Sequence, residues 1–307
     1  MKTLGIVTLP NAQTDLPKIY NDILKTAGLS HEYEYRHFEV AETDFTTFFE
    51  SAAKNNIWGL QLTPPFNEKI IGAVSLSEEF SFLRQVQSID AIIRKDNVWV
   101  GHNTEVIAFT KELKAFFKLK GKNAVVFGVG YSARCATYVL ASEGAEEIAV
   151  FAKDRKKTRA LAEAMKPFFP ACQIYAATSI DDVYIEKKEL FVNATALGRK
   201  KIDAMPIEEG LFHKDLSIFD FIYDPPETKL IHRAQMRGLR TCGGRGIFLE
   251  QIKLSFELFT GKSISDELLQ RVLSGEGKKT KFYIRVVLIA LGFWLLVYLF
   301  LLFFFVD

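Results

Sequence analysis

The sequence predicts an α/β protein with two units, followed by a C-terminal transmembrane helix. Strand-like apolar segments alternate with amphipathic, helix-like segments up to about residue 273, which is typical of a largely parallel sheet. A glycine-rich loop at 128–133 directly follows a buried strand and opens a helix. The run at 286–306 contains no charged residue and is long enough to cross a bilayer as a helix.

Composition excludes several classes of protein. The chain has 307 residues, of which 49% are hydrophobic, so it is long enough for about two domains and too apolar to be disordered. Its net charge of +2 argues against a dedicated nucleic-acid binder. Its 3 cysteines are widely spaced, which indicates a reducing compartment rather than a disulfide framework, and its 5 histidines show no metal-ligand spacing.

The first predicted unit mixes strands and helices. We expect strands near 3–9, 33–40, 58–63, 91–94 and 98–101, with helices near 16–26, 44–54 and 105–117.

The second unit begins with the apolar strand at 123–128. We expect further strands at 147–151, 173–176, 190–193 and 218–221, with helices at 131–142 and 155–166 between them. Pro167 ends the second of these helices, because proline cannot continue a helix. After Gly238 the pattern predicts a last strand, then helices at 246–259 and 266–273.

The glycine loop has the pattern of a dinucleotide-binding turn. The first glycine permits a tight turn, the second lets the backbone approach a pyrophosphate, and the helix N-terminus favours an anion. An ordinary glycine turn is the alternative. The Rossmann-like interpretation assigns cofactor contacts to Gly128, Val129, Gly130, Tyr131 and Ser132.

Basic residues follow the next strand, where an NAD site usually has a carboxylate. Ala152 and Lys153 come first, and Lys157 lies four residues beyond Lys153. A 2′-phosphate suits these cations, so the sequence favours NADP over NAD. Asp154 opposes this interpretation because its charge would repel the phosphate. The alternative is an ordinary solvated helix start.

A basic segment precedes the uncharged run. Residues 274–285 contain three lysines and one arginine, and such a flank is expected to stay in the cytoplasm. We therefore expect 286–306 to anchor a cytoplasmic globular part to a membrane, with 274–285 as linker. A buried core helix is the alternative, although such a helix normally keeps a polar stripe.

Six segments together resemble the shikimate dehydrogenase family, in the family's order. They are GLQLTPPFNEKI (59–70), GHNTEVIAF (101–109), GVGYSARCA (128–136), FVNATALG (191–198), YDPPETKLIHRAQMRG (223–238) and GGRGIFLEQIKLSFELFTG (243–261). The resemblance implies reduction of 3-dehydroshikimate with NADPH. It also implies a substrate-binding domain at 1–105, completed by 237–273, and an NADP-binding domain at 106–236.

Some of the family's site residues are kept in this chain and others are replaced. Thr63, Tyr223 and Gln251 keep the identities of family substrate contacts, and Thr14 stands at the first serine of the family's carboxylate clamp. The second clamp position holds Leu16, which has no donor. Asp90 stands where the family has a substrate-binding asparagine. Matching positions near the cofactor are occupied by Asn193, Phe221 and Gly244.

The catalytic pair departs from the family's lysine and aspartate. Asn67 stands at the lysine position and Glu105 at the aspartate position. An amide does not titrate, so Glu105 is left as the acid or base. Replacement of the lysine by Lys69 is an alternative. Asp90 and Glu105 together would repel an anionic substrate unless one of them is protonated.

Two functions from different classes follow. The leading interpretation is an NADP-linked oxidoreductase that acts on shikimate, 3-dehydroshikimate or a related hydroxy-ring acid. The alternative is a membrane-tethered pseudoenzyme that binds a nucleotide or a partner without hydride transfer, which Asn67, Leu16 and Asp154 favour. The sequence leaves open whether the chain forms a homodimer.

Overall fold

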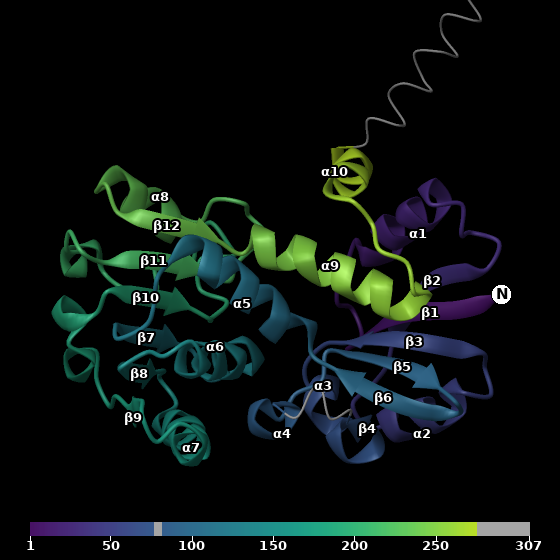
Figure 1. Cartoon of the computed structure of the whole chain (residues 1–307), viewed down its shortest axis with the longest axis horizontal. Helices are drawn as coiled ribbons and strands as arrows, with labels where there is room; N and C mark the ends of the chain where they lie inside the picture. Colours follow the sequence, from purple (N-terminus) through teal and green to yellow (C-terminus); the bar gives the residue numbers. More distant parts are fainter. Residues whose placement is uncertain (77–81, 275–307) are drawn as a thin grey trace, which may run out of the picture.

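The computed structural model describes residues 1–76 and 82–274, and the described chain forms two six-stranded sheets (Figure 1). Helix α9, Arg245–Thr260, runs along both sheets in this view. The expected anchor and all of the expected linker except Ser274, which ends α10, lie outside the described residues. Within the described part of the chain, no helix is long and apolar enough to cross a membrane.

The first sheet has the order β2-β1-β3-β5-β6-β4. Strand β1 pairs in parallel with β2 and β3, whereas β5 runs antiparallel to both β3 and β6. The apolar run of β1 is almost wholly buried, as expected of a central parallel strand. The strands are β1 (Lys2–Thr8), β2 (Tyr33–Glu39), β3 (Ile57–Leu62), β4 (Ser75–Leu76), β5 (Ala91–Lys95) and β6 (Val98–His102).

Helices cover both faces of this sheet. One buried cluster joins the sheet to α1, α9 and α10, and another joins it to α2 and α3. The helices of this unit are α1 (Leu16–Thr26), α2 (Phe45–Ala52), α3 (Phe66–Lys69), η1 (Ile71–Ala73), α4 (Leu83–Val86) and α10 (Asp266–Ser274).

The second sheet is entirely parallel and has the order β12-β11-β10-β7-β8-β9. This is the doubly wound order, in which successive strands are added on one side of the first strand, here β7, and then on its other side. A ligand crevice is expected where β7 lies between β10 and β8. The strands are β7 (Asn123–Phe127), β8 (Glu147–Phe151), β9 (Gln173–Ala176), β10 (Leu190–Asn193), β11 (Ser217–Asp220) and β12 (Arg240–Gly243).

Helices again lie on both faces. A buried cluster with α5, α6 and α7 covers one face, and another with α8 covers the other. The elements are α5 (Thr104–Phe116), α6 (Tyr131–Ser142), α7 (Arg155–Met165), η3 (Lys166–Phe168), η4 (Asp181–Val183), η5 (Ile185–Lys187), η6 (Glu209–Leu211) and α8 (Lys229–Met236). As Pro167 predicts, the α-helix ends just before it, and a single 3₁₀ turn follows.

One element lies outside the unit to which the sequence assigned it. We expected 237–273 to complete the first unit, but β12 pairs in parallel with β11 in the second sheet. The chain therefore leaves the second sheet only after Gly243, and the expected boundary at 236 is a few residues too early. The reason is that β12 has only four residues and continues directly from the turn at Gly238, so the sequence pattern alone does not assign it to a sheet.

Candidate active site

A cleft of about 530 Å³ lies between the two sheets. It receives side chains from the loops after β1 and β3 on one side and from the starts of α5 and α6 on the other. Residues far apart in the chain thus share one wall. The predicted site residues that line it are Thr14, Thr63, Asp90, Glu105, Gly130, Tyr131, Ser132, Phe221, Tyr223 and Gln251.

The glycine loop connects β7 to α6 as the sequence predicts. Gly128 has a φ of +126°, and a Cβ there would lie 2.6 Å from the carbonyl oxygen of Ala194, so no other residue fits. Gly130 caps α6 and has open space beside it. The backbone N–H groups at the start of α6 therefore face a space that a phosphate can enter. Val129 is half-buried and does not line the cleft.

The Asp90 carboxylate is hydrogen-bonded to the first turn of α5. It accepts the backbone N–H of Thr104, at 2.7 and 2.9 Å, and of Glu105, at 2.9 Å. The hydroxyl groups of Thr104 and Tyr131 also donate to it. Burial raises the pKa of Asp90, and these hydrogen bonds oppose the shift. Asp90 therefore both caps the N-terminus of α5 and lines the cleft.

Glu105 is a buried acid at the edge of the same cleft. Its side chain is 8% exposed, and Oε1 has no hydrogen-bond partner among the described residues. Burial raises the pKa of Glu105 to about 8; a hydrogen bond with Ser132 opposes the shift and the charge of Asp90 adds to it. Glu105 is thus mostly protonated at neutral pH, so the repulsion between two carboxylates expected from the sequence does not arise.

Asn67 does not reach the cleft, contrary to the expectation that it lies beside Glu105. It is fully buried in α3, where its amide donates to Ser88 Oγ at 2.9 Å. An uncharged amide can be packed under this loop, whereas a lysine could not be buried there without a partner. Lys69 does not replace the missing lysine either, since it pairs with Glu42 at 2.8 Å on the surface.

Two threonines lie on the substrate side of the cleft. Thr14 lines it just before α1, and its Oγ1 accepts the backbone N–H of Leu16. Thr63 follows β3, and its hydroxyl donates to the carbonyl of Val7. Leu16 also lines the cleft and supplies an apolar surface where the resemblance implies a donor.

Tyr223 and Gln251 complete the opposite wall. The ring of Tyr223 stacks on Phe248, with centroids 4.3 Å apart and planes 6° apart, and Tyr223 is 41% exposed. Gln251 Nε2 lies 3.5 Å from both Asp90 Oδ2 and Thr104 Oγ1. Helix α9 therefore presents a donor to the group that caps α5.

Arg199 is a lining residue that the sequence analysis missed. It belongs to the loop after β10 and is exposed at the cleft, and it is the one cation among the described lining residues. Its charge lowers the pKa of Tyr223, although burial raises that pKa more. Its position in the sequence could have indicated this role, because Arg199 lies six residues after the end of a parallel strand, and ligands bind at the carboxyl ends of such strands.

The basic segment after β8 forms the start of α7. Asp154 is the N-cap of this helix and accepts the backbone N–H of Lys157 at 3.0 Å. Lys157 Nζ also lies 3.9 Å from the Asp154 carboxylate. Lys153 and Lys157 are exposed and Ala152 is half-buried, outside the cleft itself. A cap explains Asp154 without any cofactor, which the sequence analysis did not consider.

Two expected cofactor contacts, Asn193 and Gly244, also have structural roles. Asn193 is fully buried; its amide donates to Asp220 and its oxygen accepts from Thr195, so it fixes the turn after β10. Gly244 allows a close backbone approach, because a Cβ there would lie 2.2 Å from the carbonyl oxygen of Phe221. The contact of Asn193 with Asp220 and that of Gly244 with Phe221 each span more than 20 residues of sequence, which no local pattern reveals.

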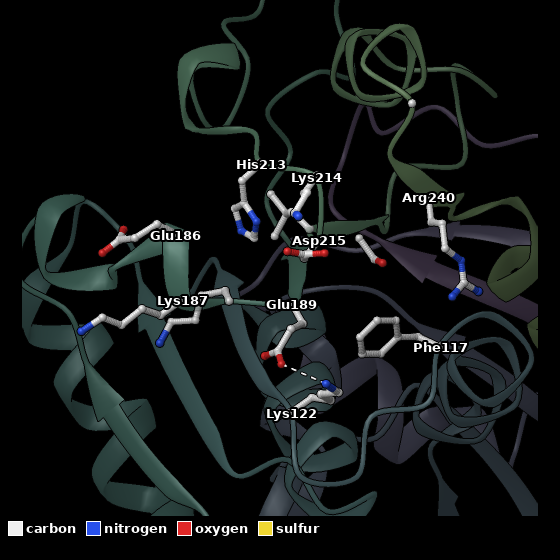
Figure 2. A pocket seen from close by; sticks show the side chains of 13 residues that line it. Phe117, Lys122, Glu186, Lys187, Glu189, His213, Lys214, Asp215 and Arg240 are labelled. Carbon is white, nitrogen blue, oxygen red and sulfur yellow. Dashed lines mark hydrogen bonds and ion pairs between the residues drawn. The ribbon is translucent and has the colours of Figure 1, made fainter.

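A second hollow, of about 560 Å³, lies at the opposite edge of the second sheet (Figure 2). It forms where β7, β10, β11 and β12 begin, far from the glycine loop at the other end of β7. Lys122 and Glu189 pair across it at 3.2 Å, and Arg240 donates to the carbonyl of Phe116. None of the predicted site residues lines this hollow, so it is a weaker candidate than the cleft.

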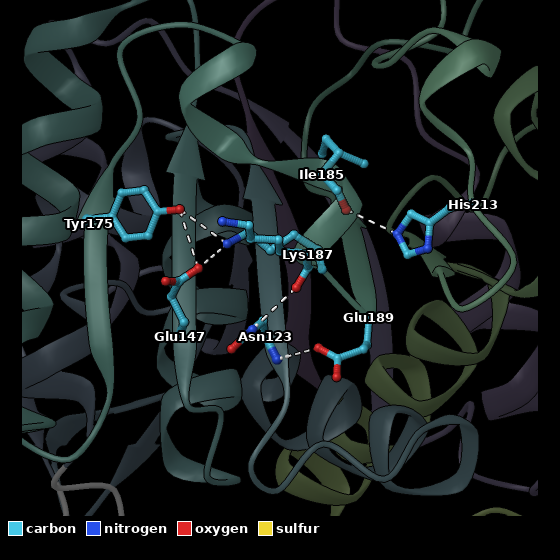
Figure 3. Close-up of polar contacts among 8 residues, drawn as sticks. Asn123, Glu147, Tyr175, Ile185, Lys187, Glu189 and His213 are labelled. Carbon is cyan, nitrogen blue, oxygen red and sulfur yellow. Dashed lines mark hydrogen bonds and ion pairs between the residues drawn. The ribbon is translucent and has the colours of Figure 1, made fainter.

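The polar groups beside this hollow hold strands together (Figure 3). Lys188 is 1% exposed and pairs with Glu147 of β8, while its Nζ lies 3.2 Å from the hydroxyl of Tyr175 on β9. Glu189 accepts the backbone N–H of Asn123 at 2.8 Å. These contacts join β7, β8 and β9 to the segment that leads into β10.

Known proteins resemble the chain over most of its length. The sequence profile of the shikimate dehydrogenase substrate binding domain matches residues 6–83. A shikimate dehydrogenase (NADP(+)) from Afipia carboxidovorans is 31% identical over 264 residues, which are 85% of this chain and 91% of the relative. A second, from Alkaliphilus metalliredigens, is 27% identical over 89% of this chain and 96% of the relative.

Solved structures share the fold. A shikimate dehydrogenase from Aquifex aeolicus superposes with a TM-score of 0.76 at 27% identity, over 89% of this chain and 97% of the other. A shikimate 5-dehydrogenase from Listeria monocytogenes, in complex with shikimate and NAD, gives a TM-score of 0.78 at 23% identity, over 89% and 96%. At that lower identity the likeness concerns the fold alone.

Proposed function

Because this chain belongs to the shikimate dehydrogenase family, we propose that it is an NADP-dependent oxidoreductase that interconverts shikimate, or a related hydroxy-ring acid, and its keto form. One observation carries the proposal: the start of α6, the substrate-type residues Thr63 and Gln251, and a buried acid share one cleft. Its cofactor would be NADP, in keeping with the cofactor named for its relatives.

Glu105 is suited to the proton transfer of this reaction. NADPH, when bound, would supply the hydride that reaches the carbonyl carbon. With a pKa of about 8, Glu105 holds a proton at neutral pH and can give it to the developing alkoxide oxygen. In the oxidation direction the ionised form takes the hydroxyl proton. Thr14, Thr63 and Gln251 would orient the ring by hydrogen bonds.

No specific observation favours the pseudoenzyme. Asp154, which supported it, caps α7. Leu16 has no hydrogen-bond donor for a substrate carboxylate, but the Arg199 cation at the cleft can attract such a carboxylate. Asn67 lacks an acid function, but Glu105 retains one with a pKa near the working pH.

An absorbance assay tests the proposal. The full chain, in mild detergent, is mixed with NADPH and 3-dehydroshikimate, and in reverse with NADP and shikimate or quinate; Glu105→Gln is the matched control. We expect turnover by the wild type and a loss of about 10²-fold or more in the variant. Binding of NADPH without turnover of any of these substrates would instead identify a pseudoenzyme.

We also propose that the uncharged run at 286–306 tethers the enzyme to a membrane, with the globular part in the cytoplasm. The support is the length of the run and the basic segment before it. Such a tether would fix the enzyme near a membrane without altering the cleft, because the run follows the last described helix, α10.

A further inference from the structure

Tyr131 connects the glycine loop to the other unit. It is the first residue of α6. Its phenol hydroxyl donates to Asp90 Oδ2 at 2.7 Å, and Asp90 directly precedes β5 of the first sheet. The hydroxyl also lies 3.5 Å from Asn103 Oδ1. One side chain of the nucleotide-binding loop thus crosses the cleft that separates the sheets.

The hydrogen bond of Tyr131 falls on the group that fixes Glu105. Asp90 Oδ2 accepts from Tyr131 and also from the backbone N–H of Glu105, at 2.9 Å. Asp90 additionally holds Thr104 through its backbone N–H and its hydroxyl. A shift of the Asp90 carboxylate would therefore move the first turn of α5, on which Glu105 stands.

The neighbouring residue makes a second connection. A side-chain hydrogen bond with Ser132 lowers the pKa of Glu105 against the larger effect of burial, so two consecutive residues at the start of α6 act on the two buried carboxyl groups of the cleft. Glu105 Oε1 has no hydrogen-bond partner among the described residues. The pKa of Glu105 consequently depends on where the start of α6 lies.

We propose that Tyr131 is a positioning residue for the proton-transfer group: acting through Asp90, it holds Glu105 toward the reacting oxygen. This inference rests on the proposed function for its catalytic consequence. It gives Tyr131 a role that the glycine-loop pattern does not supply, since the pattern needs only backbone N–H groups there. Tyr131 itself transfers no proton; its hydrogen points at Asp90.

The first test is a double-mutant cycle with Tyr131→Phe and Glu105→Gln. We expect Tyr131→Phe to lower kcat by about tenfold to 10²-fold, the loss typical of a misplaced catalytic group, with little change in the KM for NADPH. In the Glu105→Gln background the same change should cost less than about twofold. Equal losses in both backgrounds would overturn the proposal and make Tyr131 an independent contributor.

Tyr175→Phe is the matched control. It removes a phenol hydroxyl that lies 3.4 Å from a carboxylate, Glu147, in the same unit but outside the cleft. We expect it to leave kcat unchanged. If it lowered kcat as much as Tyr131→Phe does, the effect would be a general loss of packing.

A second readout needs no turnover. The pH dependence of the stability difference between the wild type and Glu105→Gln reports the midpoint at which Glu105 ionises. Tyr131→Phe removes a donor from the Asp90 carboxylate, so its charge acts more strongly on Glu105 and the midpoint should rise by about half a pH unit. An unchanged midpoint would overturn the proposal. Absence of turnover with a shifted midpoint would overturn only the proposed function.

Asp90→Asn is a second variant, which tests the same link if Tyr131→Phe does not fold. An asparagine keeps the shape of Asp90, and its oxygen still accepts one donor, but the negative charge beside Glu105 is gone. We expect the Glu105 midpoint to fall by about half a pH unit or more in this variant. A midpoint equal to that of the wild type would show that Asp90 does not link Tyr131 to Glu105.

Discussion

Two carboxyl groups near one cleft differ in what their surroundings let them do. Asp90 accepts four hydrogen bonds from Thr104, Glu105 and Tyr131 in addition to a weak one from Gln251, so its negative charge is stabilised. Glu105 Oε1 has no partner among the described residues, and its pKa is raised to about 8. The sequence shows a carboxyl side chain at each of these positions. Only the contacts in the folded protein make Asp90 a helix cap and Glu105 a proton donor.

The pKa of Glu105 predicts opposite pH profiles for the two reaction directions. Reduction needs the protonated form, so kcat should fall as the pH rises through about 8. Oxidation needs the ionised form, so its kcat should rise over the same range. Steady-state rates with saturating substrates, measured in both directions, check this. Profiles that fall or rise together would assign the proton transfer to another group.

Because its pKa is raised in the folded state, Glu105 lowers the free energy of unfolding at high pH. The folded state holds the proton up to about pH 8, whereas the unfolded chain releases it near its usual pKa, so stability is full at low pH and is lost as the pH rises. Glu105→Gln should therefore be more stable than the wild type, by up to about 1.4 kcal/mol for each pH unit above the usual carboxyl pKa.

Urea unfolding of the wild type and Glu105→Gln at about pH 6 and about pH 8 measures this difference. Glu163→Gln serves as control, because Glu163 is exposed on α7 and makes only a surface pair with Lys166. A stability difference that does not grow with pH would show that Glu105 is ionised in the folded protein.

At the scale of elements, helix starts determine the chemistry of this protein. Gly130 leaves the start of α6 open, and Asp90 caps the start of α5. Asp154 caps α7 beside the basic residues expected to hold the 2′-phosphate. Gly130 and Asp154 directly precede their helices in the sequence, whereas Asp90 lies 14 residues before Thr104 and reaches α5 only in the folded chain. Whether such a residue binds its own helix or a ligand is decided by side-chain geometry.

Asp154→Thr should tighten NADPH binding by about fivefold, the effect of about 1 kcal/mol that one nearby exposed charge produces. Threonine also caps helices, so α7 should persist while the negative charge beside Lys153 and Lys157 is lost. NADH binding should not change. Titration calorimetry with both nucleotides checks this.

Asp215→Asn is the matched control for this substitution. It removes the same charge at the opposite edge of the second sheet, where the second hollow lies. If it tightened NADPH binding as much, the effect would come from net charge. Equal binding of NADH and NADPH by the wild type would mean that the lysines do not contact the cofactor.

At the scale of the whole molecule, the two sheets form the cleft jointly. Helix α9 begins beside the second sheet, where Gly244 packs against Phe221, and continues onto the first, where Ile252 and Phe256 are buried. The same helix carries Gln251 into the cleft. The substrate-type residues of the two chain ends are brought together in this way.

The uncharged run predicts how the full chain partitions. We expect the protein to stay with membranes after carbonate extraction, because a span of this length is held by the hydrocarbon core. A chain that ends at residue 282 should be recovered in the soluble fraction with the same cofactor affinity. Release of the full chain by carbonate would contradict the tether; an insoluble truncated chain would show that the tail supports folding.

The sequence by itself determined the order of the elements, the parallel character of the second sheet and the turn at Gly128, because apolar periodicity and glycine geometry act over a few residues. It also placed Thr63, Glu105 and Gln251 at one site through the resemblance. Only the tertiary structure decided that Asn67 is buried away from the cleft, that Asn193 fixes a turn, and that β12 completes the second sheet. The burial of Asn67 and the pairing of β12 depend on partners 20 or more residues away, as does the bond from Asn193 to Asp220. Burial and hydrogen bonding between such partners set the orientation and pKa of each group.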